Sequence, residues 1–142
     1  MIKRTAQARW QGDLRKGQGT LELGSGAFSG RYSFSTRFEE APGTNPEELI
    51  GAANAACFSM ALSAALSQDG YKVDEIHTEA TVSMEKGEGG FSIVGITLET
   101  SARVKDITME DFISYTSDAK LNCPVSKALA AVDISLDAHL LK

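Results

Sequence analysis

The stretch NPEELIGAANAACFSMALSAALSQ, residues 45–68, decides how this chain folds. Asn45 is a good helix N-cap, Pro46 suits the first helical position, and Glu48 lies where a capping box places its acidic residue. Gly70 is a typical stop signal just beyond the run. The sequence therefore predicts one helix of about 24 residues, ~36 Å long.

This predicted helix carries no charge between Glu48 and Asp69, and those twenty residues are enough to span a bilayer. Most of them are Ala, Ser, Gly or Asn, which transfer weakly to lipid. A helix that is small and apolar all round is typical of the centre of a globular fold or of a helix–helix interface. We therefore expect a buried helix rather than a membrane span. The strongly apolar positions are Leu49, Ile50, Phe58, Met60, Leu62 and Leu66.

Alternating side chains predict strands before the helix. Residues 5–13 and 19–23 are short alternating stretches separated by the turn-forming sequence GDLRKGQG. The segment GRYSFSTRF, residues 30–38, then alternates strictly between polar and apolar or small side chains. The pattern predicts three strands in this part of the chain.

The period of two returns after the helix. Residues 75–84 and 94–104 alternate on either side of a glycine-rich hairpin turn at residues 86–90. Phe91 and Ile93 fall out of phase with the second of these stretches, which indicates a bulge near Gly95.

Two helices and a strand complete the predicted order. Thr108 begins a helix that runs to about Leu121, and a short helix through Ala131 follows with Pro124 at its first position. Residues 132–140 alternate as a final strand. The resulting order, βββ-α-ββ-αα-β, has no internal linker and no repeat, which favours one α+β domain with antiparallel sheets.

Composition and charge exclude several classes of protein. The chain has 142 residues, of which 42% are hydrophobic and 23% charged, with a net charge of −5, so residues 1–142 suit one globular domain. Basic residues are scattered, so nothing indicates a nucleic-acid partner. The N-terminal sequence MIKRTAQARW has no apolar segment of a secretory signal, and we expect a cytoplasmic protein.

The only two cysteines, Cys57 and Cys123, can be two small buried hydrophobes or two parts of one chemistry. Cys123 falls at the start of a predicted helix, where free N–H groups favour an anion. Cys57 lies about three turns into its helix, beyond that effect. A free thiol is only ~3% ionised at pH 7, so a reactive Cys57 needs a cation from elsewhere, and arginine is permanently charged.

Other chemistries fit poorly. The chain has no C-x-x-C pair, no nucleotide-binding glycine motif and no zinc-finger spacing. His77 and His139 alternate onto polar strand faces, where we expect them to be solvated. A cysteine protease would need a histidine base near Cys57, and nothing in the sequence indicates one. We therefore predict neither a metal site nor a bound cofactor.

The motifs TRFEE, GTNPEELIGAANAACFSMAL and NCPVSKAL together resemble the OsmC/Ohr family of osmotically inducible and organic-hydroperoxide-resistance proteins, and specifically its OsmC branch. The resemblance covers essentially the whole chain. It implies a stress-response thiol peroxidase in which Cys57 is the peroxidatic nucleophile and Cys123 the resolving thiol of an intramolecular disulfide. It also implies that Arg37 is the activating cation and Glu47 its carboxylate partner.

The family resemblance further implies an intertwined homodimer, an organic hydroperoxide substrate and a lipoyl-type dithiol as reductant. Glu47 and Cys57 are ten residues apart on one predicted helix, hence ~15 Å along its axis and about 80° around it. If Glu47 supports the cation that activates Cys57, we expect it to come from the partner subunit. Glu48 is then left for capping. The alternative function is a non-catalytic binder of a small lipid-like ligand on the same dimer fold.

Overall fold

A sheet of three strands and a short helix form the first part of the chain in the computed structural model, which describes residues 1–142. The chain divides into two compact units, Met1–Leu49 and Ile50–Lys142, and each is described by itself. The strands of the first unit pair antiparallel in the order β1-β2-β3. Its elements are β1 (Ala6–Gln11), β2 (Gln18–Leu23), β3 (Ser29–Tyr32) and α1 (Phe34–Phe38).

The third predicted strand is wrong beyond Tyr32, because the backbone turns into helix α1. The side chain of Ser33 accepts a hydrogen bond from the Thr36 N–H, and the Ser33 N–H donates to the Thr36 hydroxyl, which completes a capping box. The rings of Phe34 and Phe38 contact each other in a tilted arrangement, with centroids 5.0 Å apart and planes at 50°. Because these two residues are four apart, they satisfy a helical repeat as well as the period of two that suggested a strand.

A glycine lets two aromatic rings of the first sheet meet. Gly19 pairs with Trp10 on one side and with Tyr32 on the other. A Cβ at Gly19 would lie 2.5 Å from the Tyr32 ring and 2.8 Å from that of Trp10. The missing side chain lets the two rings approach with centroids 5.5 Å apart. The glycine therefore shapes the apolar wall beside α1.

Helix α2 (Pro46–Gln68) begins and ends close to where the sequence predicts. The Glu48 N–H donates to the side-chain oxygen of Asn45 over 2.8 Å, as expected of an N-cap. The Glu48 carboxylate accepts from the Thr44 hydroxyl instead of reaching back to the cap. Gly70 has the positive φ, 88°, of a helix stop.

One face of α2 is buried, and the opposite face, which includes Met60 at 75% exposed, is open in the single chain. In the single chain the predicted buried helix is therefore buried on one face only. By length and hydropathy alone it could cross a membrane, with 28% of its most apolar window buried. Its buried apolar side chains pack instead into the core of the second unit, each contributing roughly 1.5–3 kcal/mol. They are Phe58, Leu62 and Leu66.

The second unit contains a sheet in the order β4-β5-β6, formed by β4 (Val73–Gly87), β5 (Gly90–Val104) and β6 (Ile134–Leu141). The predicted bulge is confirmed, since Ser83 pairs with Gly95 and Met84 with Ile93. The antiparallel prediction holds for β4 and β5 but is wrong for β6, which runs parallel to β5. A helical crossover joins these two strands, and such a connection brings the chain back in the parallel direction.

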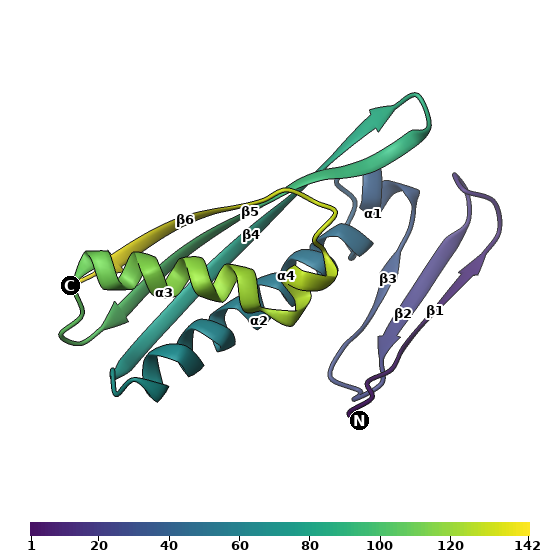
Figure 1. Ribbon diagram of the computed structural model, residues 1–142. Helices are drawn as coiled ribbons and strands as arrows, with labels where there is room; N and C mark the ends of the chain where they lie inside the picture. The colour runs from purple at the N-terminus through teal and green to yellow at the C-terminus, as the bar shows by residue number, and fades with distance from the viewer. The chain divides into compact units, whose positions relative to one another are not determined.

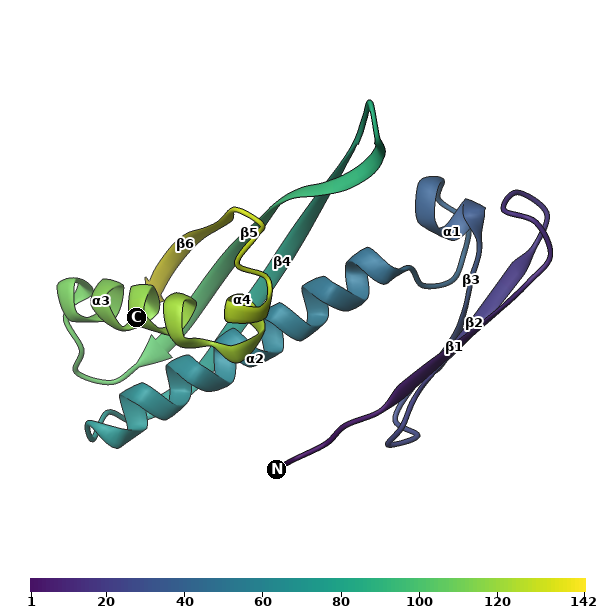
Figure 2. The ribbon, with the colours of Figure 1, turned by 45° about the vertical axis from the view of Figure 1, so that its right-hand side comes forward.

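Helices α2 and α3 (Met109–Asn122) lie on the same side of this sheet (Figures 1 and 2). Thr108 caps α3 as predicted, by accepting from the Asp111 N–H. Helix α4 (Pro124–Ala128) has proline at its start as predicted but ends before Ala131. The core between the helices and the sheet is apolar, and one of its fully buried residues is Cys123.

Candidate active site

The two cysteines are brought together by α2 and α4. Cys57 is partly exposed on α2, Cys123 is completely buried, and both are free thiols. Cys57 packs against the buried cluster that contains Cys123, and the two thiols lie close enough for each to affect the ionisation of the other. The two cysteines are therefore close neighbours in the reduced protein.

The position of Cys123 follows from its sequence neighbours. Its N–H donates to the Ala119 carbonyl over 2.9 Å and closes α3. Pro124 cannot continue that helix and instead occupies the first position of α4. The Cys123 sulfur then accepts the Ser126 N–H over 3.5 Å, in the place where a Ser or Asp oxygen commonly caps a helix. The sulfur is therefore held at the junction of two helices.

The two thiols have opposite tendencies to ionise. Burial raises the pKa of Cys57, and the hydrogen bond to Cys123 raises it further. Burial also opposes ionisation of Cys123, but hydrogen bonds from Cys57 and from the backbone and hydroxyl of Ser126 outweigh it and lower the Cys123 pKa. Within Ile50–Lys142 the hydrogen bonds therefore favour the anion on Cys123 and the proton on Cys57.

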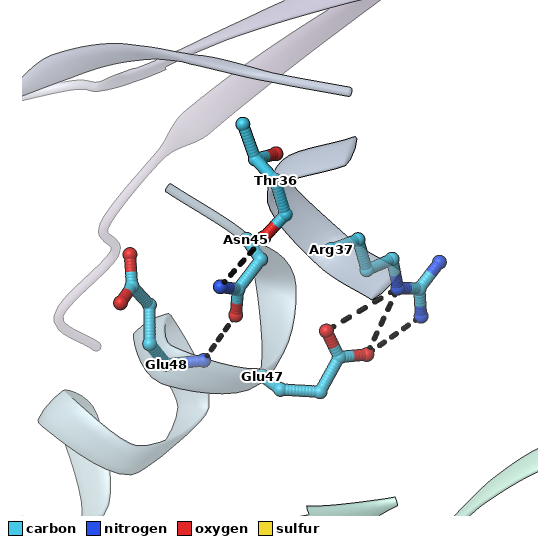
Figure 3. Close-up of polar contacts among 5 residues, drawn as sticks. All are labelled: Thr36, Arg37, Asn45, Glu47 and Glu48. Carbon is cyan, nitrogen blue, oxygen red and sulfur yellow. Dashed lines mark hydrogen bonds and ion pairs between the residues drawn. The ribbon is translucent and has the colours of Figure 1, made fainter. Parts of the chain in front are cut away.

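Arg37 and Glu47 form an ion pair in the first unit (Figure 3). The Arg37 Nη2 donates to Oε1 of Glu47 over 2.7 Å, and Nε donates to both carboxylate oxygens over 3.1 and 3.2 Å. The Glu47 side chain is 11% exposed and that of Arg37 39%. The carboxylate therefore fixes one edge of the guanidinium and leaves Nη1 for another acceptor. Glu48 takes no part in this pair, but its predicted capping role is wrong: Asn45 caps α2 by accepting the Glu48 N–H, and the Glu48 carboxylate accepts from the Thr44 hydroxyl instead.

An apolar pocket of about 300 Å³ lies beside Arg37 in the first unit. Arg37 lies over the Phe38 ring, with its guanidinium carbon 5.3 Å from the ring centroid. The pocket is therefore a mainly aromatic cavity with one cation in its wall. Its lining residues are Trp10, Leu14, Tyr32, Ser33, Phe34, Arg37 and Phe38.

Two polar residues beside the thiols were missed by the sequence analysis. Asn54 on α2 is fully buried, and its Nδ2 donates to the hydroxyl of Ser126, which is 6% exposed, over 2.9 Å. Asn54 is the only amide side chain between Glu48 and Gln68, an available signal in an otherwise small and apolar helix. Ser126 lies within the CPVS motif.

The two histidine side chains are solvent-exposed. His77 and His139 are exposed on strands, as predicted, and the Nε2 of His139 lies 3.2 Å from the exposed Asp137 carboxylate. No group of three or more His, Cys, Asp or Glu side chains is arranged to hold a metal ion.

Comparisons with known proteins place the chain in a family. The model of the OsmC-like protein family matches residues 39–137. Peroxiredoxin OsmC of Escherichia coli K12 is 46% identical over 140 residues, which cover 98% of this chain and 97% of that protein. Organic hydroperoxide resistance protein OhrB of Bacillus subtilis is 36% identical over 97 residues, or 67% of this chain and 69% of that protein.

The fold agrees with this match. The crystal structure of B. subtilis OhrB aligns with a TM-score of 0.71 and 28% identity, covering 96% of this chain and 98% of that one. The family match covers more than half of the chain and includes Glu47 and both cysteines. The chain therefore belongs to the OsmC-like protein family.

Proposed function

We propose that this protein is a thiol peroxidase that reduces organic hydroperoxides to alcohols. The observation that carries the proposal is the contact between a partly exposed thiol, Cys57, and a buried thiol, Cys123, on two different helices of an OsmC-like chain. The names of its relatives, a peroxiredoxin and organic hydroperoxide resistance proteins, support a peroxidase.

The proposed reaction has two steps on this chain. The Cys57 thiolate attacks the terminal peroxide oxygen, the O–O bond breaks, and the alkoxide leaves and takes a proton to become the alcohol. Cys57 is then a sulfenic acid. The Cys123 thiolate attacks the Cys57 sulfur, the S–S bond forms, and hydroxide leaves and is protonated to water. A short path between the thiols favours this step over further oxidation.

Cys57 needs a cation, because its surroundings in Ile50–Lys142 raise its pKa. We propose that Arg37 is this cation and that Glu47 orients it. The ion pair supports the assignment, since Glu47 holds Nε and Nη2 and leaves Nη1 to point toward a thiolate or peroxide oxygen. Such a donor would also stabilise the departing alkoxide.

The pocket beside Arg37 supports an organic substrate. Its aromatic wall suits an alkyl or aryl substituent, and each buried CH₂ contributes ~0.8 kcal/mol. Four carbons would therefore change catalytic efficiency by roughly a few hundredfold relative to hydrogen peroxide.

We further propose that the protein acts as a homodimer with composite sites. Glu47 and Cys57 are ten residues apart on α2, or ~15 Å along a helix, too far to meet around one small substrate. Arg37 and Glu47 of one subunit would then serve Cys57 of the other. An exposed apolar stripe along α2 supports helix pairing between subunits. It includes Ala52, Ala53, Ala56, Met60 and Ala64.

The remaining parts of the proposal concern the domain organisation, the cellular location and the reductant. We propose that residues 1–142 act as one domain, in the cytoplasm, with a lipoyl-type dithiol as the reductant that reopens the disulfide. The step needs no bound cofactor, because two thiols and an external dithiol balance the electrons.

The decisive experiment follows the consumption of cumene hydroperoxide by purified protein with dihydrolipoamide as the dithiol. Wild-type protein should turn over, and Cys57→Ser should not, because a serine hydroxyl is almost un-ionised at neutral pH. Substantial steady-state turnover by Cys57→Ser would refute the peroxidase mechanism. Binding of the hydroperoxide without cysteine-dependent turnover would favour the alternative, a non-catalytic binder of a lipid-like ligand.

A further inference from the structure

Asn54 and Ser126 form a buried polar link parallel to the cysteine pair. Asn54 lies three residues before Cys57 on α2, and Ser126 lies three residues after Cys123 on α4. The two helices are therefore joined twice, once through sulfur and once through the bond from Asn54 Nδ2 to the Ser126 hydroxyl, 2.9 Å long. Only the first link has a role in the peroxidase chemistry proposed above.

The second link ends on the reacting sulfur. Ser126 donates its N–H to the Cys123 sulfur over 3.5 Å. Its hydroxyl also favours the thiolate of Cys123 and lowers the pKa of that thiol. A hydroxyl has one hydrogen, so its direction matters. Because Asn54 donates to the Ser126 oxygen, the hydroxyl hydrogen is left free to point to Cys123. Asn54 thus sets the direction of the serine donor.

The stability of the fold does not explain why an amide side chain occupies position 54. Its side chain is completely buried, and its Oδ1 has no hydrogen-bond partner. A buried amide that makes only part of its hydrogen bonds is costly compared with an apolar side chain of the same size. A leucine at this position would fill similar space without that penalty. The amide is therefore better explained by what it does to Ser126.

We propose that Asn54 is a positioning residue for the resolving step: it orients the Ser126 hydroxyl toward the Cys123 sulfur, the atom that attacks Cys57. In that attack the S–S bond forms, the S–O bond of the Cys57 sulfenic acid breaks, and hydroxide leaves and is protonated to water. This inference rests on the proposed peroxidase function. It assigns Asn54 no part in the attack of Cys57 on the peroxide.

The test separates the two steps in a single turnover. Reduced protein is mixed with one equivalent of cumene hydroperoxide, quenched with acid at intervals, and analysed by intact mass for sulfenic acid and disulfide. Asn54→Leu and Ser126→Ala should each slow disulfide formation about tenfold, the order expected for a lost hydrogen bond to a charged group. The reduced form should disappear no more slowly than in the wild-type protein, since that step belongs to Cys57 and does not use the Ser126 donors.

A double-mutant cycle tests whether Asn54 acts through Ser126. The variant Asn54→Leu/Ser126→Ala should resolve no more slowly than the slower single variant. A loss equal to the product of the two single losses would overturn the proposal, as would resolution at the wild-type rate in Asn54→Leu. Asn54→Ala, which cannot overpack the core, is measured in parallel so that the conclusion does not depend on the folding of one variant.

A titration distinguishes positioning from a merely structural role. In a Cys57→Ser background, the ultraviolet absorbance of the Cys123 thiolate should titrate at higher pH when Asn54→Leu is added. Thr116→Val is the matched control, because it removes a buried hydroxyl bonded to the Ile113 carbonyl on α3. It should change neither the titration nor disulfide formation, and an equal shift in this control would overturn the proposal.

The wild-type protein shows which proposal fails. If it forms no sulfenic acid and no disulfide with cumene hydroperoxide, the peroxidase function itself is wrong. If it forms both, and Asn54→Leu leaves the second step unchanged, only the role of Asn54 is wrong.

Discussion

Shortening Phe34 to alanine should change which hydroperoxide the protein prefers. Phe34 lines the pocket beside Arg37 and contacts the Phe38 ring. It also lies under the Arg15 guanidinium, whose central carbon is 4.8 Å from the Phe34 ring centroid. Phe34→Ala removes part of the apolar wall against which an organic substituent would pack. We expect a loss of efficiency with cumene hydroperoxide and little change with hydrogen peroxide, which has no such substituent.

The size of the loss follows from the surface that is no longer buried. A phenyl-sized group buries on the order of 150–250 Å² when fully enclosed, and one wall of the pocket accounts for roughly a quarter of this, ~50 Å². At ~25 cal/mol per Å², the missing contact is worth ~1.3 kcal/mol, or about tenfold in kcat/KM.

The assay is the ratio of kcat/KM for cumene hydroperoxide to that for hydrogen peroxide. Phe34 and Arg37 are three residues apart on α1, so the substitution can also disturb the guanidinium. Such a disturbance acts on both substrates and cancels in the ratio. Phe28→Ala is the matched control, because this phenylalanine is 40% exposed and does not line the pocket. An equal loss with both peroxides in Phe34→Ala would refute the reasoning.

Three further predictions concern the thiols and their cation. Cys123→Ser should leave the first turnover intact and then hold Cys57 as sulfenic or higher acids, seen by intact mass; prompt recovery with dithiol at the wild-type rate would contradict a resolving role. Burial and the hydrogen bond to Cys123 raise the pKa of Cys57, and Arg37→Met should leave this rise uncompensated. The rate of the first turnover should then increase with pH over a higher pH range than in the wild-type protein. An unchanged pH profile in rapid-mixing experiments would rule out Arg37 as the cation. Cys57→Ser chains refolded together with Glu47→Ala chains should be more active than the sum of the two homodimers, because one site of the heterodimer is intact; strict additivity, with heterodimers confirmed by native mass, would place Glu47 outside a shared site.

Local sequence signals predicted the helices and strands correctly where the apolar side chains followed a single periodicity, that of a helix or that of a strand. The caps at Asn45 and Thr108 fix the start of two helices because hydrogen bonding to the first free N–H groups is a local matter. Residues 33–38 fitted two repeats at once. Phe34 and Phe38 match both a strand and a helix, and the signal that decides between them is the capping box from Ser33 to Thr36.

The direction of β6 was predicted wrongly because alternation indicates which residues share a face of a strand and not the direction in which the strand runs. The alternation of residues 132–140 is equally compatible with either direction beside β5. The two helices between β5 and β6 were the available signal, since a crossover of that length returns the chain parallel. The connection, rather than the strand itself, carried the information.

The candidate site likewise has contacts that the sequence indicated and one that it did not. The partnership of Arg37 with Glu47 and that of the two cysteines came from the resemblance of short motifs, and the ion pair and the thiol contact are present. The bond between Asn54 and Ser126 joins residues 72 positions apart, and it exists only because α2 and α4 pack together. No spacing along the sequence indicates such a contact.

The distribution of the proton between the thiols has a consequence for the order of the reaction. Contacts within Ile50–Lys142 favour a thiolate on Cys123, which suits the resolving step but not the attack on the peroxide. In the proposed reaction the first step requires the anion on Cys57, so we expect a cation outside these contacts to reverse the preference when substrate is present. After Cys57 is oxidised it no longer competes for the charge, and the hydrogen bonds of Ser126 again favour the Cys123 thiolate. One pair of thiols can thus serve both steps, provided that the arginine acts on the first and the Ser126 donors act on the second.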